Sequence, residues 1–322
     1  MSQTFTLDDV QGTLKRRDAW WTVLLVDPLA SRLVVVTANR TSLTPNQLTF
    51  IGLGFGLCAA ALFWVGAAWA LILGAVLFHI SFVVDCMDGK IARLKGNGSV
   101  IGGWLDYIFD RIRVLFCSIG LFGGLAYHTG NPWWIWLAFV VVFVDMLRYM
   151  DAMQISLVRE KMHASVTAAC EEAGTDPLSY LGKYAPEEDN ETVDRRGPMA
   201  ERTPEQEADA QAKLVASVAM QQTFQGRYSW YLSARDWLRG RRIRPHLFSG
   251  IEFQMFIFIV GPIAAAILGS WAIAVVTIAS AVGLLLFEAV LVYKLVLSTR
   301  DMAALVAKLQ ANKSPQVVDQ PS

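Results

Sequence analysis

Residues 85–110 read DCMDGKIARLKGNGSVIGGWLDYIFD and place four aspartates between long apolar runs. Asp85 and Asp88 are three positions apart, and Asp106 and Asp110 are four apart. Each pair therefore lies on one face of a helix. An ionised acid inside a membrane segment costs about 2.5–3.5 kcal/mol unless it is paired or solvated. Two antiparallel helices joined by a short turn would bring the four carboxylates together, and such a cluster predicts a site for hard divalent cations.

The alternative interpretation is that basic residues in and after this stretch simply neutralise the acids. Those residues are Lys90, Arg93, Lys95, Arg111 and Arg113. Ordinary ion pairing gives no reason for the small residues Gly89 and Ala92 on the first acid face, or for Gly102 one turn before the second acid pair. Because small residues leave room for a bound molecule, we favour a ligand site.

The full pattern is Asp85-x2-Asp88-Gly89-x2-Ala92-Arg93-x8-Gly102-x3-Asp106-x3-Asp110. It resembles the signature of the CDP-alcohol phosphotransferase family, with every position present. The resemblance covers about residues 44–160 and 248–298. It implies a homodimeric membrane enzyme that uses two Mg²⁺ or Mn²⁺ ions. In such an enzyme an alcohol hydroxyl attacks the phosphorus bonded to the donor alcohol of a CDP-alcohol, and CMP leaves.

Residue by residue, the resemblance implies that Asp85, Asp88 and Asp106 are metal ligands. Asp110 would share a metal and act as the catalytic general base that takes the proton of the attacking hydroxyl. Nucleotide binding would involve the three metal ligands together with Asn46, Thr49, Gly89, Ala92, Arg93 and Gly102. For Asn46 and Thr49, helix capping and packing are the alternative. Oxygen ligands without a Cys or His set favour Mg²⁺ or Mn²⁺ over zinc.

Three arginines are candidates for binding a phosphorylated acceptor, namely Arg111, Arg113 and Arg148. Asp145 and Asp151 flank Arg148 at helical spacing, so a local ion pair is the alternative for that arginine. Glu288 lies in the last apolar run, where we expect a polar contact between helices.

The composition is 54% hydrophobic and 17% charged, and the apolar residues lie in long blocks. This pattern favours a membrane protein over a large soluble domain. The formal net charge of zero gives no indication of a nucleic-acid partner, and we expect none. Four cysteines without paired spacing are typical of reduced structural thiols. The first 18 residues are polar and no small-residue cleavage site follows, so we expect no signal peptide.

The apolar runs predict an all-α membrane bundle with six transmembrane helices. The helices are expected at about residues 44–66, 67–94, 99–127, from 132 to beyond 149, 248–268 and 272–297. An N-terminal segment, residues 1–43, precedes them. Its run at 19–38 is expected to be an interfacial amphipathic helix, because Asp27, Pro28 and Arg32 interrupt the apolar sequence. A true span is the alternative for this run.

The remaining boundaries follow from these helices. Residues 44–160 carry the first four transmembrane helices with the catalytic motif, and residues 248–298 carry the last two. Residues 161–247 are expected to form a cytosolic insertion, partly disordered, with helical patterns at 203–223 and a basic, aromatic pattern at 227–244. Residues 299–322 are expected to form a cytosolic tail.

The distribution of basic residues predicts the orientation. The short connections near residues 65–70, 128–134 and 269–272 contain no Lys or Arg, whereas the other connections are basic. Basic connections face the cytosol in membrane proteins. We therefore expect an integral protein of the cell membrane with both termini and the acid cluster on the cytosolic side, where a nucleotide can reach them.

The favoured function is transfer of a phosphatidyl group from CDP-diacylglycerol to a polyol or polyol phosphate, which forms a phospholipid. The alternative within the family is CDP-choline or CDP-ethanolamine with diacylglycerol as acceptor. A cation transporter would require charged groups in the outer half of the bundle, and the four acids all cluster at one end. A non-catalytic scaffold would be indicated by a lost motif residue. The two substrates themselves cannot be identified from the sequence.

Overall fold

The computed structural model describes residues 4–172, 237–238, 240–244 and 248–311. In these residues every regular element is a helix, and the β-contact present is an isolated bridge between Asp18 and Ile243. The predicted all-α class is therefore confirmed. The predicted helix at 203–223 and most of the basic pattern at 227–244 lie outside the described residues.

The chain divides into two compact units. The described part of the first unit contains residues 4–150, 237–244 without 239, and 248–288, and the described part of the second contains residues 151–172 and 289–311. Two long helices contribute to both units. All four motif aspartates belong to the first unit, so the site can be built from that unit alone.

The N-terminal segment forms a short helix α1 (Leu7–Gly12), a π-helical turn η1 (Thr22–Val26) and a helix α2 (Asp27–Arg40). A capping box joins Thr6 and Asp9 at the start of α1. Hydrogen bonds from the Thr6 amide and hydroxyl lower the pKa of the Asp9 carboxyl. The helix expected at 19–38 is thus present. Its stretch from Thr22 to Arg40 is long and apolar enough to cross a membrane, so the interfacial placement stays a prediction.

The next two helices begin and end where the sequence indicated. Helix α3 (Pro45–Val65) starts with a capping box between Thr44 and Gln47 and ends at Gly66, whose φ is 71°. Helix α4 (Ala68–Lys95) ends at Gly96, whose φ is 62°. Glycine accepts this left-handed conformation without a Cβ clash, which explains both stops.

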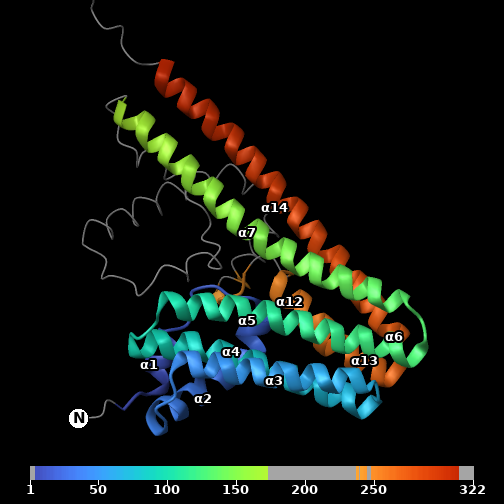
Figure 1. Cartoon of the computed structure of the whole chain (residues 1–322). Helices are drawn as coiled ribbons and strands as arrows, with labels where there is room; N and C mark the ends of the chain where they lie inside the picture. The colour runs from blue at the N-terminus through green and yellow to red at the C-terminus, as the bar shows by residue number, and fades with distance from the viewer. Residues whose placement is uncertain (1–3, 173–236, 239, 245–247, 312–322) are drawn as a thin grey trace, which may run out of the picture. The chain divides into compact units, whose positions relative to one another are not determined.

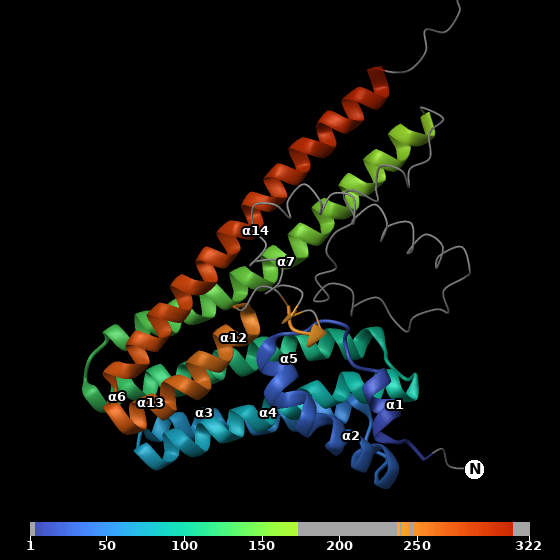
Figure 2. The ribbon, with the colours of Figure 1, turned by 180° about the vertical axis from the view of Figure 1, so that it is seen from behind.

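Helix α5 (Val100–Ser118) continues through a π-helical turn η2 (Ile119–Gly123) into α6 (Gly124–Thr129). Ser99 caps α5 by accepting a hydrogen bond from the Gly102 amide at 2.9 Å. Helix α3 packs closely against both α4 and α5, as Figures 1 and 2 show. Among the glycines of α5, η2 and α6, Gly120 of η2 lies nearest to α3. A Cβ added to it would lie 2.2 Å from the Ala60 carbonyl oxygen.

The remaining elements are α7 (Trp133–Glu172), α12 (Gly250–Met255), η3 (Phe256–Val260), α13 (Gly261–Leu268) and α14 (Trp271–Ala311). Helix α7 continues past Tyr149, as predicted, and reaches Glu172, while α14 runs well past the predicted end at residue 297. No Gly or Pro interrupts residues 150–172 or 298–311, so nothing in the backbone stops either helix. Residues 161–172, expected in the insertion, are therefore the last turns of α7.

Within the described residues, five helical stretches are long and apolar enough to span a membrane. They are Thr22–Arg40, Pro45–Val65, Ala68–Lys95, Gly250–Leu268 and Trp271–Ala307. Helix α5 is not one of them, because two aspartates and two arginines fall within its residues 106–113. The chain is a polytopic membrane bundle, and the six-span count stays a prediction.

Each unit has its own apolar core. In the first unit the Phe258 ring lies 4.9 Å from the Phe78 ring and 6.4 Å from the Phe63 ring. His79, which is more often a core residue than a ligand in such a position, packs edge-on against Trp21 at 6.3 Å. The second unit is held by contacts among Val166, Ala169, Cys170, Met302 and Leu309. None of the four cysteines forms a disulfide.

Candidate metal and nucleotide site

Three of the motif acids meet at one point. Asp85 and Asp88 come from α4 and Asp106 comes from α5, and one carboxylate oxygen from each lies within 4.8 Å of the others. Helices α4 and α5 approach each other less closely than either approaches α3, which leaves room for the acid side chains between them. Carboxylate oxygens alone are the donors that Mg²⁺ and Mn²⁺ prefer. The three residues present therefore fit a hard divalent cation.

Asp110 is not part of this group of three, although Arg113 links it to Asp85. Its carboxylate forms an ion pair with Arg113, one turn further along α5, and lies 3.8 Å from Arg111. The family resemblance implied that Asp110 shares a metal with the other three acids and acts as the general base. The structure instead places Asp110 against arginines, and its roles as metal ligand and general base stay predictions.

The connection between α4 and α5 brings the acids together. After Gly96 the amide of Asn97 donates a hydrogen bond back to the Ala92 carbonyl at 3.1 Å, and α5 begins three residues later. A Cβ on Gly102 would lie 2.7 Å from Asn46 Oδ1. Gly102 thus makes room for the Asn46 side chain, and both predicted nucleotide residues lie together next to the α5 start.

Thr49 contacts the metal site directly. Its hydroxyl lies 2.5 Å from Asp88 Oδ2 and 3.1 Å from the Pro45 carbonyl, and the residue is 3% exposed. A hydroxyl donating to a carboxylate fixes the carboxylate's orientation. Thr49 therefore orients a predicted metal ligand, and contact with a nucleotide stays a prediction for it.

The other predicted nucleotide residues follow Asp88 on α4. Arg93 Nε donates to the Thr13 carbonyl at 2.9 Å, so the N-terminal segment contacts the last turns of α4. A Cβ on Gly89 would lie 3.4 Å from the Arg93 guanidinium, and one on Gly98 would lie 3.7 Å from Ala92 Cβ. Gly89, Ala92 and Arg93 thus lie close together on one short surface. Nucleotide binding by these residues stays a prediction.

Lys90 does not neutralise the motif acids in the way the alternative interpretation required. Its ammonium lies 3.1 Å from Asp27 of α2 and donates to the Cys86 carbonyl. Arg242 also contacts Asp27, at 3.3 Å, and donates to the Lys15 carbonyl. Lys90 therefore ties α4 to the N-terminal segment.

The three candidate acceptor arginines all face carboxylates. Arg111 pairs with Asp145 and stacks on the Tyr149 ring at 3.4 Å. Arg148 lies 3.2 Å from Glu288, which confirms the expected polar contact between helices at that glutamate. Arg113 is 2% exposed and pairs with Asp110. Acceptor binding by these arginines stays a prediction.

Two polar neighbours of this network escaped the sequence analysis. Gln254 of α12 donates to Asp145 at 2.8 Å, and Ser81 of α4 contacts Arg113 at 3.3 Å. Neither residue carries charge or belongs to a spaced motif. The one sequence feature that pointed to a polar network here was Asp145. Its spacing from Arg148 suggested only a local ion pair within α7.

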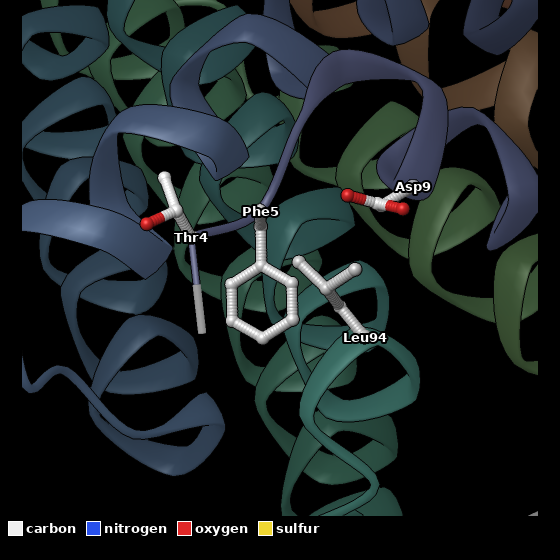
Figure 3. A pocket seen from close by; sticks show the side chains of 4 residues that line it. All are labelled: Thr4, Phe5, Asp9 and Leu94. Carbon is white, nitrogen blue, oxygen red and sulfur yellow. The ribbon is translucent and has the colours of Figure 1, made fainter. Parts of the chain in front are cut away.

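A separate pocket of about 380 Å³ lies beside the end of α4. Thr4, Phe5, Asp9 and Leu94 line it, and Figure 3 shows the Phe5 ring next to the Leu94 side chain. None of these four residues belongs to the acid cluster. The pocket is therefore a feature of the N-terminal segment and not the metal site.

Breaking one side of the Arg148–Glu288 pair is expected to destabilise the bundle. Removing one partner of a buried ion pair costs about 3–5 kcal/mol, whereas replacing both by apolar residues is often neutral. Arg148→Met and Glu288→Met should each lower the thermal unfolding temperature of the protein in detergent. The double variant should recover most of that loss, and simple addition of the two losses would contradict a direct pair.

A protein-family model and several known proteins match the part of this chain that contains the aspartate motif. The family model for CDP-alcohol phosphatidyltransferase matches residues 42–173. Phosphatidylinositol phosphate synthase of Corynebacterium glutamicum is 28% identical over 146 residues, which are 44% of this chain and 59% of that protein. Archaetidylinositol phosphate synthase of Pyrococcus horikoshii is 36% identical over 90 residues, 28% of this chain and 46% of that protein.

A Mycobacterium tuberculosis protein named provisionally as a cardiolipin synthase is 36% identical over 153 residues. The alignment covers 47% of this chain and 62% of that protein. The chain thus spans less than two thirds of the length of each of these relatives. The matched segment contains every position of the aspartate motif.

Proposed function

We propose that this membrane protein transfers a phosphatidyl group from CDP-diacylglycerol to a polyol or polyol phosphate, because the family model for CDP-alcohol phosphatidyltransferase matches residues 42–173. The observation that carries the proposal is the meeting of Asp85, Asp88 and Asp106 within 4.8 Å inside the matched segment. Two of the relatives are named as synthases of inositol phosphate lipids, which supports a phosphorylated polyol as acceptor.

Asp85, Asp88 and Asp106 would hold the metal, with Thr49 fixing Asp88 from the side. When bound, Mg²⁺ or Mn²⁺ would neutralise negative charge on the donor's diphosphate. Phosphoryl transfer then depends mainly on positioning and electrostatics. Arg93 lies near the end of α4, where it can exchange its bond to the Thr13 carbonyl for one to a phosphate.

The reaction forms one bond and breaks one. The acceptor hydroxyl oxygen bonds to the phosphorus that carries the diacylglycerol, the bond from that phosphorus to CMP breaks, and CMP leaves with the electron pair. Asp110 takes the hydroxyl proton. We extend the proposal to a homodimer in the cell membrane with the acid cluster facing the cytosol, which the distribution of basic residues supports.

A substrate screen tests the proposal. Purified protein in detergent is given labelled CDP-diacylglycerol with a panel of polyols, polyol phosphates and glycerol phosphate, and CMP release is measured. Release with one class of acceptor is the expected result. Release only with CDP-choline or CDP-ethanolamine and diacylglycerol would replace the proposed substrates, and no release with any pair would overturn the proposal.

Removal of divalent metal is expected to abolish turnover. Carboxylates alone cannot neutralise the diphosphate, so EDTA should lower CMP release to the background rate, and excess Mg²⁺ or Mn²⁺ should restore it. Ca²⁺ and Zn²⁺ serve as comparison ions. CMP release that persists after EDTA and gel filtration would contradict a metal-dependent reaction.

A further inference from the structure

Arg113 is the largest of the fully buried side chains in the described residues, with 2% exposure. It lies on α5 one turn after Asp110, with which it forms an ion pair, and its guanidinium lies 3.5 Å from Asp85 on α4. Its Nη1 also contacts Ser81 Oγ at 3.3 Å. A buried cation is tolerated only when it is paired, and here a single guanidinium links two of the four motif acids.

Glycine in α3 makes the space for this side chain. A Cβ on Gly56 would lie 2.8 Å from Arg113 Cγ and 2.9 Å from Arg113 Cδ. Ser81 of α4 holds α3 close to the same position, because its hydroxyl donates to the Gly52 carbonyl of α3 at 2.6 Å. Gly54, between these two glycines, has no atom within 4 Å of an added Cβ. Of these three glycines, Gly56 is the one at which an added Cβ would collide with the Arg113 side chain.

Burial separates Arg113 from the acceptor. A soluble alcohol phosphate cannot reach a side chain that is 2% exposed and enclosed by Phe78 and Phe82, whose rings lie 5.8 and 6.0 Å from the guanidinium. The contacts point instead toward Asp110. A guanidinium presents its donors in a rigid planar fork, so it can hold one carboxylate while contacting a second. A lysine ammonium has no such fork.

We propose that Arg113 is a positioning residue of the transfer reaction, which holds Asp110 toward the attacking hydroxyl, and that Gly56 is required to seat it. This inference rests on the proposed function. It gives Arg113 a task different from acceptor binding. Arg113 acts through Asp110 without contacting either substrate.

Two pairs of variants in the full-length protein test this role. Arg113→Met should lower kcat by about tenfold to hundredfold, the scale of loss when a catalytic group is misplaced by about 1 Å. Because Arg113 reaches the donor site only through Asp85, at 3.5 Å, the donor KM should change less than kcat. Arg113→Lys, which keeps the charge, should recover part of the loss. Gly56→Ala should reproduce the kcat loss, and Gly54→Ala is the matched control with unchanged kcat.

Binding of Mn²⁺ to the substrate-free variants, followed by electron paramagnetic resonance, separates positioning from a structural defect. Arg113→Met removes a positive charge beside the acids, so it should bind Mn²⁺ at least as tightly as the wild type. Weakened Mn²⁺ binding in parallel with kcat would mean that Arg113 builds the metal site, and would overturn the inference. Thermal unfolding of each variant identifies any that fail to fold, and Arg113→Lys then carries the test.

The outcomes distinguish this inference from the proposed function. A wild type that releases no CMP overturns both. A wild type that releases CMP, with Arg113→Met and Gly56→Ala at wild-type kcat, overturns the positioning role alone. A kcat loss shared by Gly54→Ala would also overturn it, because the effect would then come from α3 in general and not from the seat of Arg113.

Discussion

Asp110→Asn is expected to lower kcat by about 10²–10⁴-fold, the contribution of a positioned general base. The amide keeps the size of the carboxylate but cannot take the hydroxyl proton. Because the other three acids meet without Asp110, binding of CDP with Mn²⁺ should be retained. The measurements are CMP release with CDP-diacylglycerol and calorimetric titration with CDP and Mn²⁺.

The matched control is Asp27→Asn, the same change at an aspartate that also forms ion pairs but lies outside the acid cluster. It should keep most of its turnover while losing some thermal stability. A near-normal rate for Asp110→Asn would show that the base is assigned wrongly. Loss of CDP and Mn²⁺ binding in Asp110→Asn would instead place this carboxylate among the metal ligands.

Asp88→Asn is expected to lose binding and turnover together. Charge stabilisation by a bound metal is worth several kcal/mol, and each 1.4 kcal/mol or so is tenfold, so the loss should be about 10³-fold or more. Asp88 is one of the three acids that meet, and it is also the acid that Thr49 orients. Mn²⁺ binding to the substrate-free protein should fall in step with CMP release.

Thr49→Val provides a graded comparison. It leaves the Asp88 carboxylate in place and removes only the hydroxyl that contacts it at 2.5 Å. A hydrogen bond to a charged group contributes about 1.5–3 kcal/mol, so the loss should be roughly tenfold to hundredfold. Wild-type Mn²⁺ affinity in Asp88→Asn would contradict the three-acid site, whatever the result for Thr49→Val.

Much of the site region could be predicted from residue spacing. Helical periodicity placed Asp85 and Asp88 on one face of α4, and the glycine-containing turn after Lys95 returned the chain so that Asp106 met them. Thr44 and Pro45 marked the start of α3. These features are local, because caps, turns and one-turn spacings depend on neighbours within a few residues.

Residue spacing did not predict which cation pairs with which acid. The sequence names the nearby cations but does not say which acid each one contacts. Lys90 turned to Asp27 of α2, and Arg113 turned inward because Gly56 of another helix left space for its stem. Such choices depend on packing between helices that are distant in the chain, and spacing along one helix carries no information about them.

Helix length was the other point of difference. Hydrophobic runs predicted helices of membrane length, yet α7 extends to Glu172 and α14 to Ala311. A hydropathy argument ends a helix where polarity begins. The backbone ends it where Gly, Pro or a cap intervenes, and α7 contains neither Gly nor Pro after Trp133.

The contact between Arg148 and Glu288 has a consequence for biosynthesis. Arg148 leaves the ribosome long before Glu288 is translated, so this pair cannot form while the nascent chain is being inserted. A charge at bilayer depth is costly without its partner, so a membrane span at the start of α7, as the sequence predicts, favours holding α7 beside the insertion machinery until α14 arrives. Chains truncated before the last helix should therefore be the species that cellular proteases recognise and remove.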